Sequence, residues 1–481
     1  MAGGAAESIL SMGLDVGTTT TILILSRLTV KNIASAASVP RIEIVSKDIL
    51  YAGQIHPTPF LGEDTIDEKA LMDLILREYE RAGVKPGEVD SGAVIVTGHA
   101  ALKSNAENVL HRLAVNAGRF VVASAGPHLE AIIAGRGSGA AERSRRLGQV
   151  VANLDIGGGT TNIGFFSGGE PREALAVNVG ARLIRLSPVS GVIEYVSPHG
   201  RMVLDSLGIR LKTGDALGLD RTRVIAGRLA SVIEEVMNGP LSELATSLMI
   251  GRPRSPGMVP QAISFSGGVG GLVYESREVT TIRQAAAFGD LGPVLAEEIR
   301  KTSLWTGGGV FKPDQTIYAT VIGAGAYMTE LSGSTIFIGS PSALPLRNVP
   351  VVKPFDGGLP GDEEEITTLV VRALRMIDSG DGGEAVAIAI RIPQPGFAEV
   401  MRLARGIDGA FGDAWNSPVV VVTDGDFGKV LGQTLKSIDP GRAVVCIDQV
   451  RVESGDYIDI GEPLYSGSVV PVVVKTLVFS H

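Results

Sequence analysis

Two short stretches place an aspartate, glycines and threonines directly after an apolar run. Residues 13–21 read GLDVGTTTT, and residues 153–166 read NLDIGGGTTNIGFF. The two aspartates, Asp15 and Asp155, are 155 − 15 = 140 residues apart. One such stretch could be an ordinary hairpin turn, but two matched copies a domain's length apart favour a duplicated phosphate-binding hairpin.

The residue types in these stretches suit a polyphosphate. Glycines allow successive backbone N–H groups to turn toward an anion, and threonine hydroxyls add further donors. An aspartate beside a polyphosphate would repel it unless a cation intervenes, and Mg²⁺ is usually held by carboxylates, waters and substrate phosphates. We therefore predict that Asp15 and Asp155 are catalytic and hold Mg²⁺ through water. The predicted phosphate-binding residues are Gly17, Thr18, Thr19, Thr20, Gly157, Gly158, Gly159, Thr160 and Thr161.

A third glycine-rich stretch, FSGGVGGLV at 265–273, follows the apolar AISF. We predict that Gly267, Gly268 and Gly270 bind adenosine, because glycines let a flat base or ribose lie against the backbone. Segments 125–135 and 321–333 are rich in Ala and Gly, which would let two helices cross closely, as a hinge between two lobes requires. The sequence contains neither a Walker A motif nor a strict G-x-G-x-x-G, which excludes P-loop and dinucleotide-binding proteins.

Strand-like and helix-like segments alternate along the chain, which predicts an α/β fold. Core-packing helices are expected at 65–83, at 104–118 and at 222–239. The first two would begin at capping boxes, Thr65 with Glu68 and Ser104 with Glu107, and His111 would face solvent.

The composition changes near residue 335 to short segments rich in Pro and Gly, so we predict a linker over 336–364. A fresh alternation follows, with helices near 365–377, 397–405 and 427–437 between apolar strands. This pattern predicts an additional C-terminal α/β domain over 365–481. The closing strands are similar to half of a biotinyl or lipoyl carrier barrel, but no lysine sits at a hairpin tip, which favours a structural hairpin.

Composition narrows the class of protein. The net charge is −9 with no basic stripe, so a nucleic-acid partner is not expected. Cys446 is the single cysteine, which fits a reducing cytoplasm. No apolar stretch is long enough to span a membrane, and the N-terminus lacks a signal peptide's basic region. A homodimer is compatible with the sequence, which does not determine the oligomeric state.

The order of these motifs resembles that of the actin, sugar kinase and heat-shock chaperone ATPase superfamily. The resemblance implies a two-lobed fold with duplicated ribonuclease H-like lobes that binds ATP or ADP and Mg²⁺. The first lobe would span 1–140 and the second 141–335, with the helix of 321–335 packing back. The chaperones carry a glutamate before the proline of the first connecting helix, whereas this chain has Gly126 before Pro127. Glu130, one turn further on, is the candidate substitute.

Within that superfamily the chain resembles the ethanolamine ammonia-lyase reactivating factors. The resemblance is carried by both hairpins, by FVVASAGPHLEAIIAG, and by the tail GDYIDIGEPLYSGSVVPVVVKTL, among other stretches between residues 13 and 476. It implies a chaperone-like, slow Mg²⁺-dependent ATPase of ethanolamine utilisation, cytoplasmic and associated with the ethanolamine microcompartment. Its partner would be adenosylcobalamin-dependent ethanolamine ammonia-lyase, whose damaged cobalamin it would help to exchange for intact adenosylcobalamin.

Two further observations bear on this resemblance. No D-x-H-x-x-G cobalamin-binding signature surrounds any of the six histidines, so the protein need not hold the cobalamin itself. A sugar- or acetate-type kinase of the same superfamily is the main alternative, although no catalytic base can be nominated for it. An actin-like filament protein is disfavoured by the additional C-terminal domain.

Overall fold

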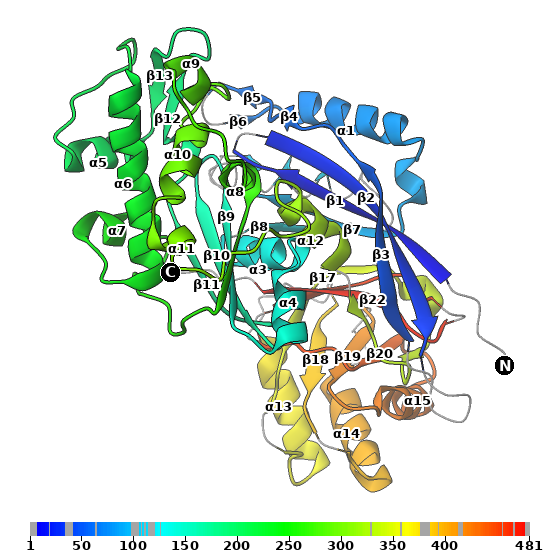
Figure 1. Cartoon of the computed structure of the whole chain (residues 1–481). Coiled ribbons are helices and arrows are strands. Elements are labelled where there is room, and N and C mark those ends of the chain that lie inside the picture. The colour runs from blue at the N-terminus through cyan, green and yellow to red at the C-terminus, as the bar shows by residue number, and fades with distance from the viewer. Residues whose placement is uncertain are drawn as a thin grey trace.

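The computed structural model describes most of the chain between residues 7 and 476 (Figure 1). The residues of this span that are not described are 19, 34–41, 63–64, 98–104, 107, 110–111, 114–120, 126, 328–329, 356–357, 376–384, 393, 412–416, 455 and 465–466.

The first half is built on a sheet whose strand order is β3-β2-β1-β7-β8, with β4 pairing β2 beside this path. The pairs β1–β2 and β2–β3 are antiparallel, whereas β7 and β8 continue the sheet in parallel with β1. Its elements are β1 (Glu7–Val16), β2 (Thr20–Asn32), β3 (Ile42–Ala52), β4 (His56–Pro57), β7 (Ser91–Val96) and β8 (Val121–Ala125), with β5 (Phe60–Leu61) and β6 (Thr65–Ile66) pairing separately.

The second half repeats this arrangement with the strand order β11-β10-β9-β14. Again the first three strands are antiparallel, and β14 runs parallel to β9. The strands are β9 (Val151–Ile156), β10 (Thr161–Ser167), β11 (Glu170–Val177) and β14 (Ala262–Ser266). The matching order confirms the predicted α/β fold with duplicated halves.

Helices and short strands of the second half surround an extensive apolar core. The helix predicted over 222–239 is observed as α6 (Leu219–Asn238), which buries Ile225, Leu229, Val232 and Val236 as expected. The other elements are β12 (Ile184–Leu186), β13 (Ile193–Val196), α5 (Pro198–Ser206), α7 (Glu243–Leu248), α8 (Gly267–Val273), α9 (Ile282–Ala285), α10 (Gly292–Ile299) and α11 (Ser303–Thr306).

The helix predicted over 65–83 is observed as α1 (Glu68–Ala82), but its start differs from the prediction. Thr65 belongs to strand β6, and the N-cap is Asp67, whose carboxylate accepts a hydrogen bond from the Ala70 N–H. The Thr65–Glu68 capping box is therefore wrong, because strand pairing with β5 takes the threonine. Ser104, Glu107 and His111 lie outside the described residues.

Two helices rich in small residues, α3 (Pro127–Gly137) and α12 (Ala319–Tyr327), cross between the halves. The crossing depends on glycine, because a Cβ at Gly137 would clash with the Ala319 carbonyl and one at Gly323 with the Ile133 carbonyl. Helix α12 packs on β1, β2 and β7 of the first half, as expected for a helix that packs back. Helix α3 packs on the second sheet together with α4 (Ala140–Leu147), so the boundary at residue 140 does not separate the two packing units.

The C-terminal part contains an eight-stranded sheet ordered β15-β22-β21-β17-β18-β19-β20-β16 (Figure 1). Strands β17 to β20 are parallel and carry the helices α13, α14 and α15. Side chains on the other face of these strands form a second apolar cluster with residues of β21 and β22, which are antiparallel strands of the same sheet. The bounds are β15 (Glu330–Leu331), β16 (Phe337–Ile338), β17 (Leu346–Val352), α13 (Glu363–Arg375), β18 (Ala387–Ile390), α14 (Phe397–Ala410), β19 (Val419–Thr423), α15 (Gly428–Ile438), β20 (Val444–Asp448), β21 (Asp456–Ile460) and β22 (Pro471–Thr476).

Two features of this part differ from the prediction. The expected linker over 336–364 contains β16 and β17, which are integral strands of the sheet. The tail also contacts both halves described above, because Val473 of β22 packs with Ala93 and Ile95 of β7, Ile133 of α3 and Ala324 of α12. The C-terminal part is therefore packed into the crossing of α3 and α12.

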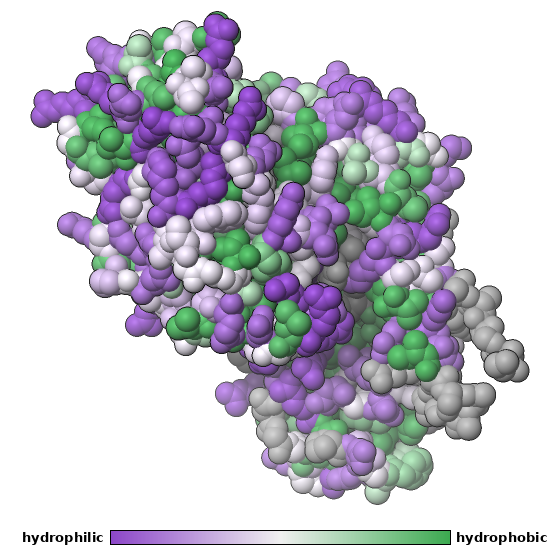
Figure 2. Space-filling model, in the orientation of Figure 1, coloured by the Kyte–Doolittle hydropathy of each residue, from purple (hydrophilic) through white to green (hydrophobic). Residues whose placement is uncertain are grey.

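The visible surface is mixed in polarity. Figure 2 shows hydrophilic side chains over much of this face, with small groups of hydrophobic residues between them. Among the described residues, none of the helices has the length and apolar character needed to span a bilayer.

Candidate functional site

The two predicted hairpins have the same local geometry. In the first, the Gly17 N–H donates to the Thr20 carbonyl at 2.9 Å, and in the second the Gly157 N–H donates to the Thr160 carbonyl at 3.0 Å. Each aspartate is the penultimate residue of the strand that enters the turn. The duplication thus extends to single hydrogen bonds, and it places Asp15 and Asp155 at equivalent positions.

Both hairpins face one cavity of about 470 Å³. This volume lies within the range of about 300–1,000 Å³ that is typical of small-molecule sites. The predicted residues that line it are Asp15, Gly17, Thr18, Thr20, Asp155, Gly157, Gly158, Gly159, Thr160, Gly267 and Gly268. Glu130 lines it as well. The three predicted motifs therefore meet at one place.

The remaining predicted residues are placed differently. The Thr161 hydroxyl donates to the Val179 carbonyl at 2.7 Å, and this threonine is not among the cavity-lining residues. Gly270, in α8, faces the backbone of Phe265 of β14 and also does not line the cavity. Thr19 lies outside the described residues.

The two leading glycines of α8 serve different purposes. Gly267 has a φ of +81°, and a Cβ there would lie 2.5 Å from the Ile156 carbonyl oxygen, so this position requires glycine. A Cβ at Gly268 would meet nothing within 4 Å, because the residue faces the open cavity. Val269, Leu272 and Phe288 make this end of the cavity apolar, as a base-binding region requires.

Asp155 is buried and Asp15 is partly buried, and Arg182 is the one basic residue among the described residues that line the cavity. The Thr97 hydroxyl donates to Asp15 at 2.8 Å. Burial raises the pKa of Asp15 to about 7; the Thr97 hydrogen bond opposes this shift and the charge of Asp155 adds to it. Burial likewise raises the pKa of Asp155, although Ser266 (2.6 Å) and Thr320 (3.1 Å) donate hydrogen bonds to it. Such uncompensated carboxylates are suited to a cation, which would favour their ionised forms.

One hydroxyl of the first hairpin has an unused hydrogen-bonding capacity. The Oγ1 atom of Thr18 is buried and has no hydrogen-bond partner among the described residues. Buried polar atoms are normally paired, so an orphan at a cavity wall points to a missing ligand. A phosphate oxygen would accept from this hydroxyl.

A fully buried carboxylate, Glu78 of α1, orders the segment that follows β3. It accepts hydrogen bonds from the Tyr51 hydroxyl (2.9 Å), the Gln54 N–H (3.0 Å) and the Arg81 guanidinium, and it contacts His56 Nε2 at 2.9 Å. Burial alone would raise the pKa of Glu78, but these hydrogen bonds outweigh it and hold the pKa below its usual value. The carboxylate therefore acts as a charged anchor.

The anchored segment supports the first hairpin. The Thr58 hydroxyl donates to the Gly17 carbonyl at 2.8 Å and lies 3.1 Å from the Thr21 hydroxyl. Strand β4 pairs with Thr20 and Thr21, and Ile55 lines the cavity. The shape of the Gly17–Thr20 turn thus depends on residues about 40 positions away in the sequence.

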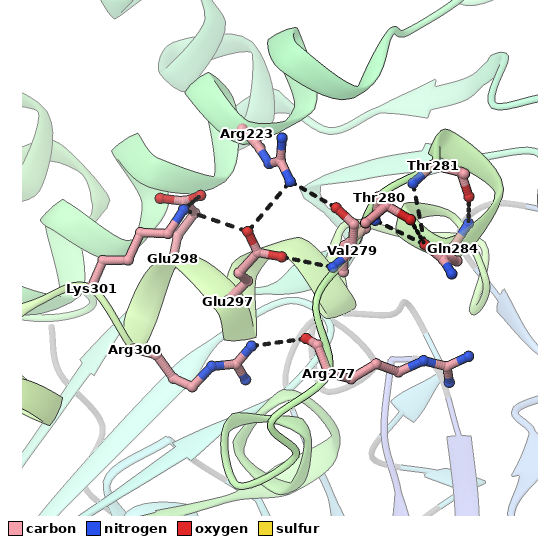
Figure 3. A network of polar contacts seen from close by, with 10 residues as sticks. All are labelled: Arg223, Arg277, Val279, Thr280, Thr281, Gln284, Glu297, Glu298, Arg300 and Lys301. Atoms are coloured by element: carbon pink, nitrogen blue, oxygen red, sulfur yellow. Dashed lines mark hydrogen bonds and ion pairs between the residues drawn. The ribbon is translucent and has the colours of Figure 1, made fainter.

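A polar network fixes the segment that follows α8 (Figure 3). Glu297 of α10 accepts from the Val279 N–H at 3.0 Å and pairs with Arg223 of α6 at 3.6 Å. The Arg300 guanidinium donates to the carbonyls of Leu272, Val273, Glu275 and Arg277. These bonds hold α8, which begins with Gly267 and Gly268, in place within the second half.

Sequence reasoning missed several cavity residues. Thr97 lines the cavity, and Ser266 does not line it but donates to Asp155. Both lie at the carboxyl ends of the strands parallel to β1 and β9, namely β7 and β14, and that position was a usable signal. Arg182 and Asp290 also line the cavity, and no local motif marks them. Thr320 is part of the small-residue helix α12, where its hydroxyl was hidden among alanines and glycines.

Two halves with the same strand order, each presenting an aspartate-ended hairpin to a shared cavity, define a protein of the actin-like α/β class. The chain belongs to the EutA family: the model of the ethanolamine utilisation protein EutA matches residues 7–480.

Curated relatives agree with this assignment. The ethanolamine ammonia-lyase reactivase EutA of Salmonella typhimurium is 39% identical over 475 residues, which covers 98% of this chain and 99% of the relative. The protein of the same description from Escherichia coli is 39% identical over 476 residues, with the same coverage.

Solved structures give weaker similarities. A Ppx/GppA family member from Aquifex aeolicus is 12% identical with a TM-score of 0.39, covering 66% of this chain and 97% of that one. The ethanolamine utilization protein EutJ from Carboxydothermus hydrogenoformans is 13% identical with a TM-score of 0.30, covering 66% of this chain and 88% of that one. The family assignment rests on the sequence relatives.

Proposed function

We propose that the protein is an ATP-dependent reactivating factor for adenosylcobalamin-dependent ethanolamine ammonia-lyase. It would promote the exchange of damaged cobalamin for intact adenosylcobalamin. The observation that carries the proposal is the 39% identity, over nearly the whole of both chains, to proteins described as ethanolamine ammonia-lyase reactivases. The duplicated hairpins at one cavity support the nucleotide dependence.

In this proposal the hairpins bind the polyphosphate of ATP or ADP. Backbone N–H groups of Gly158 and Gly159 and the hydroxyls of Thr18 and Thr160 provide donors at the cavity wall. Each hydrogen bond to a charged group contributes roughly 1.5–3 kcal/mol, so several of them offset much of the phosphate's desolvation. The adenosine lies toward Gly267, Gly268 and the apolar wall.

Asp15 and Asp155 fit Mg²⁺, because burial raises the pKa of each carboxyl group and the charge of Asp155 raises that of Asp15 further, a condition that a cation relieves. Among the described residues, no cluster of three or more His, Cys, Asp or Glu side chains could hold a metal ion by itself. Mg²⁺ that enters with the nucleotide and is held by the two aspartates through water is consistent with both observations. When bound, it would neutralise charge on the phosphates.

The geometry supports a route from the nucleotide to the rest of the molecule. Thr320 of α12 donates to Asp155, and α12 crosses α3 at glycine positions. A change in charge beside Asp155 on hydrolysis would thus bias the α3–α12 crossing. Allosteric coupling is typically about 1–3 kcal/mol, or about 5- to 150-fold in affinity, which is sufficient to switch the association with the lyase on and off.

The test is a reconstitution. Ethanolamine ammonia-lyase inactivated with a non-adenosyl cobalamin is mixed with this protein, ATP, Mg²⁺ and free adenosylcobalamin, and deamination of ethanolamine is followed. We expect recovery of activity that requires every component.

Omission of each component and replacement of ATP by ADP are the controls. Absence of recovery with a cognate lyase, together with ATP-dependent phosphorylation of a small substrate, would instead identify a kinase of the same class.

A further inference from the structure

The charges that line the nucleotide cavity are unbalanced. Four carboxylates, those of Asp15, Glu130, Asp155 and Asp290, face it. Among the described lining residues, Arg182 is the one basic side chain. A polyphosphate brings further negative charge into this cavity, so the single guanidinium has a disproportionate electrostatic effect.

The backbone of Arg182 is fixed to the second hairpin. Its N–H donates to the Gly158 carbonyl at 2.6 Å, and the Ala181 N–H donates to the Gly157 carbonyl at 3.2 Å. Gly180 lies so close to the hairpin that a Cβ there would be 2.5 Å from the Gly158 carbonyl carbon and oxygen. The position of the residue relative to the phosphate-binding turn is therefore set by backbone contacts.

The Arg182 side chain has two polar partners and keeps free donors. Nε donates to Asp290 Oδ2 at 3.2 Å, and the guanidinium contacts the Phe288 carbonyl at 3.5 Å. Asp290 is fixed in turn by the Gly292 N–H, which donates to Oδ1 at 2.9 Å. A guanidinium has five N–H donors in a planar fork, which leaves an edge available for a phosphate. The Arg182 side chain is 32% exposed, so this edge is reachable from the cavity.

We propose that Arg182 binds the polyphosphate of the nucleotide next to the nucleoside, and that Asp290 positions its guanidinium for this contact. The location follows from the neighbours of Arg182, which are the Gly157–Gly159 turn on one side and Phe288 of the apolar wall on the other. The inference rests on the proposed nucleotide-dependent function. It assigns to this chain a phosphate contact outside both hairpin motifs.

If the Arg182–Asp290 ion pair were purely structural, its loss would affect stability and would not discriminate among ATP, ADP and adenosine. Binding of ATP, ADP and adenosine to the full chain is measured by calorimetry with Mg²⁺ for the wild type, Arg182→Gln and Arg182→Lys. We expect Arg182→Gln to weaken ATP and ADP by about 10- to 100-fold and to leave adenosine within about 2-fold. Lysine keeps the charge but lacks the planar fork of donors. We therefore expect the affinity of Arg182→Lys for ATP and ADP to lie between those of the wild type and Arg182→Gln.

Two controls separate charge from folding. Arg185→Gln removes a charge from the exposed Arg185 of β12, outside the cavity, and should bind as the wild type does. The double variant Arg182→Gln with Asp290→Asn leaves no unpaired carboxylate, and it should still bind ATP less tightly than Asp290→Asn alone.

The outcomes are distinguishable. If the wild type binds ATP and Arg182→Gln binds it equally well, the Arg182 contact is wrong while the proposed function stands. The contact is also wrong if adenosine binding falls as much as ATP binding. If the wild type binds no nucleotide, both the contact and the proposed function are overturned.

Discussion

Asp15 and Asp155 occupy the same place in two copies of one hairpin, and their nearest partners are equivalent as well. Each accepts a hydrogen bond from a hydroxyl at the carboxyl end of the adjacent parallel strand, Thr97 beyond β7 and Ser266 of β14. Only Asp155 has a described partner on α12, namely Thr320. In the proposed function, this asymmetry makes Asp155 the carboxylate through which nucleotide hydrolysis would reach α12.

Asp155→Asn should lower the rate of Mg²⁺-dependent ATP hydrolysis by about 100-fold or more, because it removes a charge that would hold the cation. The melting temperature of the nucleotide-free variant should not fall, since burial already disfavours the ionised form of this carboxylate. Phosphate release and thermal unfolding measure the two effects. The exposed Asp205→Asn of α5 serves as the control. Wild-type turnover in a folded Asp155→Asn protein would contradict the assignment, and Asp15→Asn should give the same loss.

At the level of elements, the first hairpin depends on a segment that contains none of its motif residues. Glu78 of α1 anchors Tyr51, Gln54 and His56, and the same segment continues to Thr58, which bonds the Gly17 carbonyl. Gly53 is required there, because a Cβ would lie 2.5 Å from Glu78 Oε2. Helix α1 is therefore a support for the Gly17–Thr20 turn as well as a core helix.

Glu78→Gln should lower the free energy of unfolding at pH 7 by about 1–3 kcal/mol, because the bonds from Arg81 and the other donors lose their charged acceptor. It should also weaken ATP binding, because the Gly17 turn loses its support. The pKa of Glu78 is lowered from 4.5, so its contribution is complete above about pH 4.5 and is lost as the pH falls through the lowered value.

The difference in stability between wild type and Glu78→Gln should consequently shrink below about pH 4.5, and urea denaturation at pH 7, 5 and 4 measures it. Glu80→Gln changes an exposed glutamate of the same helix and should have little effect. A pH-independent difference would show that the charge of Glu78 has no role.

For the molecule as a whole, the C-terminal part is joined to the two halves that share the cavity by more than chain connectivity. After α12 the chain enters β15, which pairs with β22, and Ser332 exchanges hydrogen bonds with Val470. Val473 of β22 is fully buried among residues of β7, α3 and α12. The tail therefore contacts the crossing that nucleotide state is proposed to bias.

Val473→Ala should lower the free energy of unfolding by about 1.5–3 kcal/mol, because two buried methyl groups are lost and a cavity remains. Since β22 bridges the two parts, calorimetry should show one unfolding transition that shifts as a unit. Val189→Ala, at a valine that is 78% exposed, should change stability by less than about 0.5 kcal/mol. Two separate transitions, of which only the C-terminal one shifts, would contradict the coupling.

The sequence by itself determined the features whose physics is local. Glycines, threonines and one aspartate within a few consecutive residues specify a turn that presents amides and hydroxyls, so the residues at Asp15 and Asp155 were predictable without a fold. The periodic apolar stripe of α6 and the alternation of strands and helices beyond residue 385 were equally local signals. The repeated motif also predicted a duplicated hairpin, and the superfamily resemblance implied the duplicated lobes.

Only the tertiary structure decided which distant side chains meet these turns. Thr58 reaches Gly17 across 41 positions, Arg182 reaches Asp290 across 108, and Thr320 reaches Asp155 across 165. The Pro-containing segment of β17 was predicted as linker because its strand character comes from pairing with β18 and β21. Hydrogen bonds between segments that are distant in the sequence depend on how sheets and helices pack, and the local sequence pattern does not predict that packing.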